Sequence, residues 1–406
     1  MQEMFSTIKS IEIPSWLSTQ WIIVMYCKPQ EPEDSTSSLA MSSIYDLAFG
    51  IEIELSVLAS KKYSTWSAVA KDISARLSKK GLRNQVCDQP SHHYRVWSIV
   101  QEVTIPSQPA KNKWALELVS PIFTLSSTWL ADLETIFTEV GRAFKIEESP
   151  QCSTHIHVSR LDGRDFTPAQ LRSLAQAALL YEPYIDILMP PGRTSALSSS
   201  SSSSSYWCRS NRQSPVLAAV ASAAVTGAHP SPSSSSSSFS SHSPGSPLAA
   251  CLDLLDAAAP PARHPDDSDH RGAVAAIVET MCLFPASSAY GRAHGRKRDF
   301  VHGKVYKWNL ERLLGDHADV PRTIEFRQPP GSTTAEDAIG WGVLTLSFVA
   351  GAMASGSGRA PLVPRGEEAS LFEFWEHLHR GADVLGLDPF LTEYLRSFVN
   401  RTMPVY

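Results

Sequence analysis

"FGIEIEL", residues 49–55, decides how the chain is read, because apolar residues alternate along it with glycine or glutamate. Such alternation predicts a β-strand with one apolar and one polar face. Glu52 and Glu54 then share the polar face, where two carboxylates lie about 7 Å apart. At an effective dielectric constant near 20 they repel each other by roughly 2 kcal/mol. We therefore expect a divalent cation such as Mg²⁺ at this face, completed by substrate phosphates.

Three strand-like stretches each carry two polar residues separated by one apolar residue. The pairs are Glu52 and Glu54, His155 and His157, and Glu325 and Arg327. Taken singly, each has an ordinary interpretation: a solvated edge face, a hydrogen-bonded pair of histidines, or a structural ion pair. Glu117, an isolated acid in the apolar stretch "ALELVSP", would be costly to bury without a partner. The recurrence of this pattern favours one shared polar site.

Length and composition restrict the class of protein. The chain has 406 residues, 43% of them apolar, and a formal net charge of −5, so it can fill one large core or two smaller ones. Neither nucleic acid nor membrane is indicated as a partner, and the early apolar run "WIIVMY" is far shorter than the roughly 20 residues of a spanning helix. Six scattered cysteines indicate reduced thiols. We expect a cytoplasmic protein.

Composition also divides the chain into segments. Residues 1–40 contain a proline-rich, acidic stretch and are expected to be a disordered leader, which leaves open whether Met41 is the true start. Residues 194–299 contain two serine tracts and are expected to be a largely disordered insertion, because they bury too little apolar area to offset chain entropy of ~1–2 kcal/mol per residue. Docked islands are expected at 206–211 and 273–284. Residues 41–193 and 300–406 would form the folded domain.

Periodicity within the domain predicts both helices and strands. Helices are expected over 64–81, 130–141, 167–188 with a possible kink at Pro183, 335–353 and 370–385. Strands are expected over 49–55, 94–100, 114–123 and 152–159, and a further short strand is expected to carry Glu325 and Arg327 within "RTIEFRQPPGST". The pattern is that of an α+β protein.

Seven blocks, taken in order, resemble the amidoligase family of the carboxylate-amine ligase superfamily, to which glutamine synthetase also belongs. The blocks are "FGIEIEL", Trp97 with Glu102 and Thr104, "ELVSPIF", "CSTHIHVS", "YEPYIDILMPPGR", "SN" and "TIEFRQPPGS". The chain is similar in detail to the fungal branch, which carries long insertions. The resemblance implies a curved, mainly antiparallel sheet flanked by helices, a glutamine-synthetase-like fold around a site for ATP and Mg²⁺ or Mn²⁺.

The resemblance also implies roles for individual residues. Glu52, Glu54 and Glu117 match the metal-binding acids, His155 and His157 the histidines near the nucleotide, and Glu102, Glu325 and Arg327 the catalytic group. Arg327 is expected to face the transferred phosphate. Glu102 stands where aspartate is expected, so its longer side chain departs from the family pattern. Arg193, after "MPPG", is a candidate residue of the cofactor-binding site that would contact the substrate carboxylate. The alternative is a surface arginine at a helix end.

These residue types suit an ATP-dependent ligase that joins a carboxylate to an amine. ATP converts the carboxylate to an acyl phosphate, which the amine then attacks, so no protein nucleophile is needed. The sequence contains neither a G-x-S-x-G nucleophile elbow nor a P-loop. Two alternatives stay open: an inactive scaffold of the same fold, and a zinc hydrolase built on the histidine pair. The substrates would be small or peptide acids and amines; neither their identity nor the oligomeric state follows from the sequence.

Overall fold

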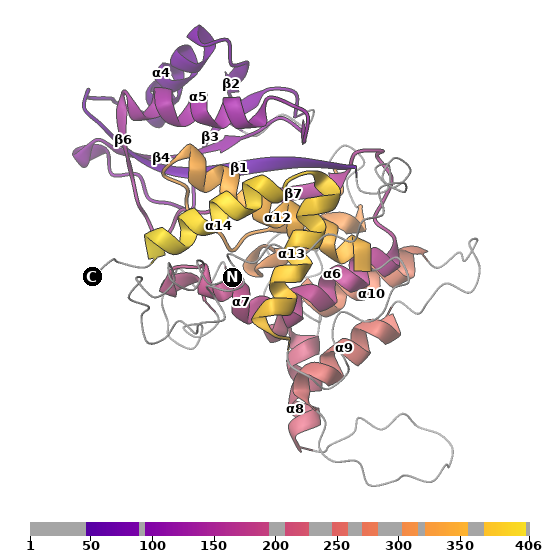
Figure 1. Cartoon of the computed structure of the whole chain (residues 1–406). Coiled ribbons are helices and arrows are strands. Elements are labelled where there is room, and N and C mark those ends of the chain that lie inside the picture. Colours follow the sequence, from indigo (N-terminus) through magenta and orange to yellow (C-terminus); the bar gives the residue numbers. More distant parts are fainter. Residues whose placement is uncertain are drawn as a thin grey trace, which may run out of the picture.

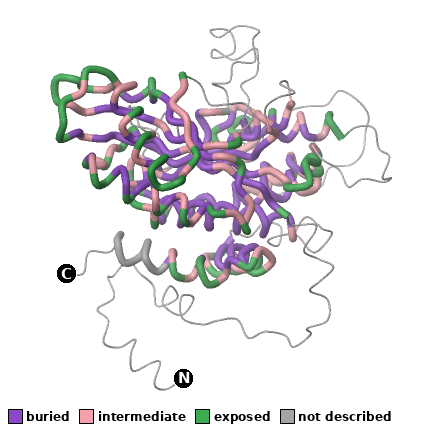
Figure 2. The backbone as a smooth tube through the Cα atoms, turned by 90° about the horizontal axis from the view of Figure 1, so that it is seen from above, coloured by how far each residue is buried: buried purple, intermediate pink, exposed green. Residues whose placement is uncertain are grey.

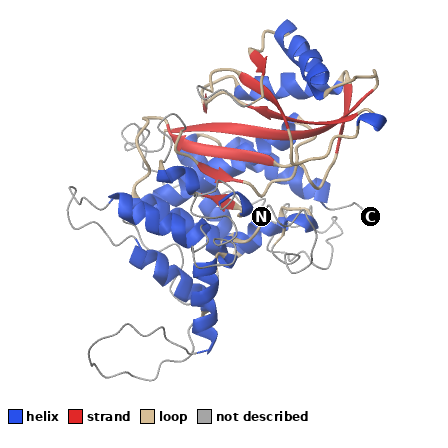
Figure 3. Ribbon diagram, turned by 180° about the vertical axis from the view of Figure 1, so that it is seen from behind, coloured by secondary structure: helices blue, strands red, loops and turns tan. Residues whose placement is uncertain are grey.

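A computed structural model describes residues 46–88, 94–194, 208–226, 246–258, 270–282, 303–315, 321–355 and 369–402. These residues form one nine-stranded sheet and a set of helices, so the predicted α+β class is confirmed. Seen from behind, the strands gather in one sheet with helices above and below it in the view (Figure 3). The most buried backbone runs through the middle of the molecule (Figure 2).

The strand order is β2-β3-β4-β1-β7-β9-β8, and β5 and β6 also pair with β1. The strands are β1 (Leu47–Ala59), β2 (Asn84–Val86), β3 (Trp97–Gln101), β4 (Lys113–Val119), β5 (Phe123–Thr124), β6 (Phe144–Glu147), β7 (Thr154–Arg160), β8 (Trp308–Asn309) and β9 (Ile324–Phe326). Only β2 and β3 pair in parallel among the described strands. The expected mainly antiparallel sheet is therefore present.

Strand β1 is the centre of this sheet and contains the quoted stretch. Its odd-numbered residues Ile51, Ile53 and Leu55 are almost completely buried in the core, as the alternating pattern predicts. β1 pairs with β7 along its first half and with β4 along most of its second half. Residues on its polar face therefore meet side chains from both neighbouring strands.

Helices α4 (Trp66–Lys79) and α5 (Trp129–Gly141) pack beside the β2, β3, β4 and β6 end of the sheet. Thr65 caps α4 by accepting a hydrogen bond from the Ala68 amide (3.2 Å), as the sequence predicts. Trp129 of α5 packs edge-on against Phe49 at 5.3 Å between ring centroids. Helix α5 thus covers part of the apolar face of β1.

Helix α12 (Ala335–Ser355) is the central helix of the core and contacts β1, β7, α5, α6 and α13. It is long and apolar enough to cross a membrane, but 89% of its most apolar stretch is buried inside the protein. This is the pattern of a core helix in a soluble protein. Helix α13 (Leu371–Leu385) crosses it closely, because a Cβ on Gly381 would lie 1.8 Å from the Ser347 carbonyl oxygen. Helix α14 (Asp388–Thr402) follows and packs on both.

The predicted helix over 167–188 is two helices. Helix α6 (Pro168–Leu180) begins with the expected capping box between Thr167 and Gln170. It ends at Leu180, and α7 (Glu182–Ile187) begins anew with Pro183 in its first turn. Proline fits the first turn of a helix, where its missing N–H needs no partner. The helix therefore ends and a new one begins at this point, instead of one helix with a kink at Pro183.

The segment expected to be a largely disordered insertion with docked islands contains three described helices, and the last of them covers most of the island expected at 273–284. They are α8 (Pro215–Thr226), α9 (Pro247–Ala258) and α10 (His270–Cys282), and α9 and α10 pack on α6 (Figure 1). Leu217, Leu255 and Ile277 are fully buried. Alanine and leucine favour helix, and neighbouring helices supply the apolar partners. The serine tracts, residues 1–40 and part of each expected island lie outside the described residues.

Candidate active site

The strand register brings the polar pairs onto one face of the sheet. In β1, Glu52 lies opposite His155 of β7 and Glu54 opposite Glu117 of β4. In β7, His157 lies opposite Glu325 of β9. Directly opposed residues in antiparallel strands point to the same side. The seven residues that share this face are Glu52, Glu54, Glu117, His155, His157, Glu325 and Arg327.

This face is enclosed rather than solvated. Glu325 is 1% exposed, His155 4%, His157 6%, Arg327 8% and Glu54 9%. Charged groups are almost never buried to this degree unless they are paired or bind a metal. The interpretation of Glu52 and Glu54 as a solvated edge face is therefore wrong.

Glu52, His157 and Glu325 form the tightest cluster on this face. Their possible ligand atoms all lie within 4.8 Å of one another, with His157 Nε2 3.1 Å from Glu52 Oε1 and 3.7 Å from Glu325 Oε1. His157 Nδ1 lies 3.1 Å from the Thr323 hydroxyl oxygen, which can hold the ring's orientation. A cation could be held here by one imidazole and two carboxylates.

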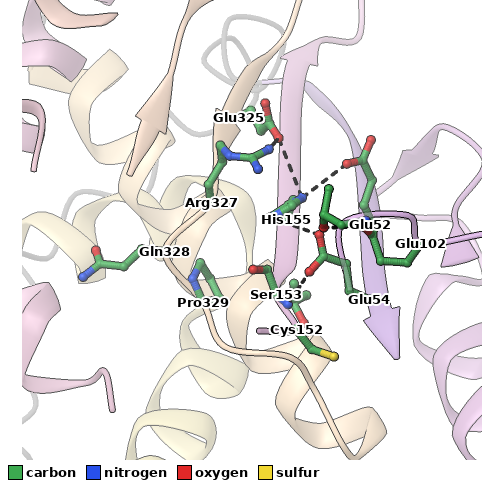
Figure 4. A network of polar contacts seen from close by, with 12 residues as sticks. Glu52, Glu54, Glu102, Cys152, Ser153, His155, Glu325, Arg327, Gln328 and Pro329 are labelled. Carbon is green, nitrogen blue, oxygen red and sulfur yellow. Dashed lines mark hydrogen bonds and ion pairs between the residues drawn. The ribbon is translucent and has the colours of Figure 1, made fainter. Parts of the chain in front are cut away.

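His155 lies between three carboxylates (Figure 4). Its Nδ1 is 3.4 Å from Glu52 Oε2 and 3.8 Å from Glu325 Oε1, and its Nε2 is 3.9 Å from Glu54 Oε1. Burial, helped by the charge of Arg327, lowers the pKa of His155 to about 4. The ring is therefore neutral at physiological pH and available as a hydrogen-bond partner or a ligand.

The carboxylates respond differently to their surroundings. Burial, helped by the charge of Glu102, raises the pKa of Glu54 to about 8. Burial and the charges of Glu52 and Glu54 raise the pKa of Glu117 well above its ordinary value. Burial raises the pKa of Glu52. The charge of His157 and the hydrogen bonds from His155 and His157 outweigh this effect, so the pKa of Glu52 lies well below its ordinary value. Crowded acids of this kind are stabilised by added positive charge.

Arg327 is a buried cation on this face. It forms an ion pair with Glu325, whose second carboxylate oxygen accepts a hydrogen bond from Asn309 Nδ2 at 2.8 Å. Burial raises the pKa of Glu325, but Arg327 outweighs that effect, so the pKa of Glu325 is strongly lowered. Within the described part of the chain, Arg327 Nε has no hydrogen-bond partner. Its guanidinium therefore keeps donor capacity for a ligand.

Glu102 lies next to the end of β3 and is also buried. Its Oε1 accepts hydrogen bonds from the Thr104 amide (2.6 Å) and the Thr104 hydroxyl. Its charge acts on Glu54 and Glu117. The longer side chain thus still brings a carboxylate to the cluster, and its catalytic role stays a prediction.

Residues 45–211 match a family model described as "Putative amidoligase enzyme". The match supports the amidoligase family for this part of the chain and an amide-bond-forming ligase as the class of protein. It covers β1 to β7 and therefore Glu52, Glu54, Glu117 and both site histidines. Strands β8 and β9, with Asn309, Glu325 and Arg327, lie beyond it. A search of curated proteins found no match.

Arg193, within the amidoligase match, is placed differently from the expectation. It is 4% exposed, and its guanidinium donates to the carbonyl oxygens of Cys152 (2.5 Å) and Pro329 (3.1 Å) and to Ser153 Oγ (2.9 Å). The Ser153 amide in turn donates to Glu54 Oε2 at 2.7 Å (Figure 4). Arg193 is therefore not a surface residue, and its guanidinium holds the turn that orients Glu54; a contact to the substrate carboxylate stays a prediction.

A second buried polar network beneath the site was not predicted. Lys307 Nζ lies 2.7 Å from Glu182 and 2.5 Å from Asp186, and Gln328 Nε2 donates to Asp186 Oδ1 at 2.5 Å. Ser210 donates to Glu182 at 2.7 Å. The blocks "YEPYIDI" and "SN" supply Glu182, Asp186 and Ser210, and "TIEFRQPPGS" supplies Gln328, whereas Lys307 lies outside the quoted blocks. No role had been assigned to these residues.

The same network anchors the chain beyond the amidoligase match. Asn211 donates through Nδ2 to the carbonyl oxygens of Trp308 (2.8 Å) and Met281 (3.1 Å), and its Oδ1 accepts from the Trp308 amide at 3.0 Å. Asn211 therefore attaches α10 and β8 to the end of the matched region. The amide side chain suits this position because it both donates and accepts hydrogen bonds.

A pocket opens beside Glu52 and His157. Its walls include Tyr94, Val119, Pro121, Ile122, Arg312 and Pro321. Arg312 hydrogen-bonds the Tyr94 side chain, and its Nη2 lies 4.0 Å from Glu52 Oε1. Sequence analysis did not identify Arg312, because it lies in a short 3₁₀ helix (Glu311–Leu314) without a periodic pattern.

Proposed function

We propose that this protein is an ATP-dependent ligase that joins a carboxylate to an amine through an acyl phosphate. The observation that carries the proposal is the convergence of carboxylates, two histidines and an arginine on one buried face of the sheet. The amidoligase match over residues 45–211 supports the class of reaction. The expected glutamine-synthetase-like architecture belongs to the same proposal.

The donor set fits Mg²⁺ or Mn²⁺. Carboxylate oxygens are preferred ligands of both ions, and imidazole is compatible with Mn²⁺. The buried His157 Nε2 lies 3.1 Å from Glu52 Oε1 and 3.7 Å from Glu325 Oε1, and Glu54 and Glu117 are crowded acids. We propose that Glu52, His157 and Glu325 hold one ion, with Glu54 and Glu117 available to a second. Bound divalent ions would neutralise the charge of the nucleotide phosphates.

The protein's own residues have separate tasks in this proposal. The guanidinium of Arg327 stabilises the negative charge that develops on the transferred phosphoryl group. Glu325 and Asn309 hold Arg327 in position. The substrate carboxylate takes the γ-phosphoryl group and ADP leaves; the amine then attacks the acyl carbon, loses a proton and releases phosphate. Enclosure of the face limits hydrolysis of the acyl phosphate by water.

Two substitutions test the proposal. Glu54→Gln removes a charge but preserves shape, so we expect Mg²⁺-dependent ATP binding and ADP formation to fail while the fold persists. Arg327→Lys keeps the charge but loses the planar fork, so turnover should fall while nucleotide binding is largely retained, the pattern of a contact made mainly in the transition state. Glu134→Gln, on the exposed surface of α5, is the matched control and should behave as wild type.

The measurement is calorimetric titration with Mg-ATP, combined with ADP release in the presence of pooled amino acids and amines. If the folded wild-type chain binds no Mg-ATP, the ligase proposal fails and the inactive scaffold is the better account. If Glu54→Gln binds Mg-ATP as tightly as the Glu134→Gln control does, the metal assignment fails.

A further inference from the structure

Gly50 leaves a hollow in the polar face of the sheet, beside Glu52. It lies on β1 directly opposite His157 of β7, and it lines the pocket described above. A Cβ built at Gly50 would meet, within 4 Å among the described residues, only Ser120 Oγ at 3.5 Å. The backbone therefore does not require glycine here for lack of space. A glycine inside a strand often marks a place where a ligand approaches closely.

We infer that this hollow binds the side chain of a small carboxylic acid whose carboxylate pairs with Arg312. This inference rests on the proposed function, because the acid would be the one that the ligase activates. The pocket combines the two features that such a ligand needs: apolar walls and a single guanidinium.

The apolar walls come from residues on several segments. Val119 is the last residue of β4, Pro121 and Ile122 lie in the segment after it, and Pro321 also lines the pocket. Ile122 is 50% exposed, so apolar surface remains open to solvent at this place. An apolar substituent that covers it gains hydrophobic free energy, whereas a charged substituent would lose hydration.

The guanidinium comes from Arg312. Its separation of 4.0 Å from Glu52 Oε1 is too long for a hydrogen bond, so donors of Arg312 are not saturated by Glu52. Arginine binds carboxylates through paired hydrogen bonds. A ligand that reaches Arg312 from the hollow would also lie next to Glu52 and His157, and thus beside the proposed metal and phosphate site.

The test uses full-length protein with MgCl₂ and a non-hydrolysable ATP analogue, titrated calorimetrically with L-leucine, glycine and L-leucinamide. The side chain should make L-leucine bind at least about tenfold more tightly than glycine. Loss of the carboxylate should make L-leucinamide bind at least about tenfold more weakly than L-leucine. Arg312→Met should abolish the second difference while preserving a preference for the apolar side chain.

Gly50→Val fills the hollow and should weaken L-leucine binding about tenfold or more, with Gly50→Ala giving a smaller effect and serving as the milder variant. Both should retain the affinity of the wild type for Mg-ATP. Ile122→Ser should also weaken binding, whereas Ile187→Ser, at an isoleucine of similar exposure (47%) that does not line this pocket, should not.

Wild-type protein that binds none of the three compounds would overturn the inference, as would a folded Gly50→Val variant that binds L-leucine like wild type. These results are separable from failure of the proposed function. L-Leucine binding without Mg-ATP binding would support the inferred pocket and contradict the proposed ligase. Mg-ATP binding without binding of L-leucine in the hollow would support the ligase and contradict the pocket.

Discussion

Arg193→Met should destabilise the fold by about 3 kcal/mol. Methionine fills much of the same volume but removes every donor from a guanidinium that serves Cys152, Pro329, Ser153 and, at 3.3 Å, the Pro150 carbonyl oxygen. Each lost hydrogen bond costs about 1 kcal/mol, and more where a buried acceptor is left unpaired. A fifth, longer hydrogen bond joins Arg193 to the Gln328 carbonyl oxygen at 3.5 Å. The Cys152 carbonyl oxygen keeps a second donor, the Gly331 amide at 2.8 Å, so the loss should be smaller than the sum of the separate hydrogen bonds.

Urea-induced unfolding of the metal-free chain measures this effect directly. Arg193→Lys should recover part of the loss, because an ammonium group reaches fewer of the same acceptors. Arg83→Met, at an exposed arginine, is the matched control and should change the free energy of unfolding by less than about 0.5 kcal/mol. The reasoning is refuted if Arg193→Met unfolds like wild type but binds Mg-ATP far more weakly, because Arg193 would then be the cofactor contact that the sequence suggested.

Two further predictions concern the helical core. A methyl group on Gly381 would lie 1.8 Å from the Ser347 carbonyl oxygen, so Gly381→Ala should lower the free energy of unfolding by about 3 kcal/mol. A methyl group on Gly141, the last residue of α5, would meet nothing within 4 Å, so Gly141→Ala should raise that free energy by up to about 1 kcal/mol. Thermal denaturation that shifts in the same direction for both variants would count against this packing. Burial lowers the pKa of His377 to about 3 from 6.5, so between pH 6.5 and 3 the unfolded chain binds a proton that the folded chain excludes, and stability falls as the pH falls. At pH 5 this residue should account for about 2 kcal/mol of lost stability, and His377→Gln, whose amide can still donate to the Phe348 carbonyl oxygen, should show a correspondingly shallower pH dependence in urea titrations.

Local pattern was sufficient for the central strand and for the convergence of the polar pairs. Alternation in "FGIEIEL" fixes which side of β1 is apolar, and the same period in the strands of His155 and Glu325 fixes their faces. Antiparallel pairing then leaves few ways to arrange these strands without burying charge in the core. The capping box at Thr167 likewise located the start of α6 to the residue.

Local pattern was not sufficient where a side chain hydrogen-bonds backbone groups that are distant in the sequence. The acceptors of Arg193 lie 41 and 136 residues away along the chain, so nothing in "MPPGR" shows where its guanidinium points. Asn309 and Arg312 lie in a two-residue strand and a four-residue 3₁₀ helix, which are too short to have a period. The alanine-rich α8 and α9 have little amphipathic character, and their burial depends on neighbours that composition does not reveal.

The site is closed by contacts between residues that are far apart in sequence, and this has an evolutionary consequence. The ring of His157 lies 3.1 Å from the hydroxyl of Thr323, although the two residues are 166 positions apart in the sequence and helices α6 to α10 lie between them. The entropy of closing such a loop grows only logarithmically, so doubling or halving its length changes the free energy by only about 0.6 kcal/mol. Selection on stability is therefore weak against gain or loss of residues between α8 and α9, provided that Asn211 still attaches β8. Related chains can be expected to differ greatly in length here while conserving the site, and an engineered reporter domain should be tolerated at the same position.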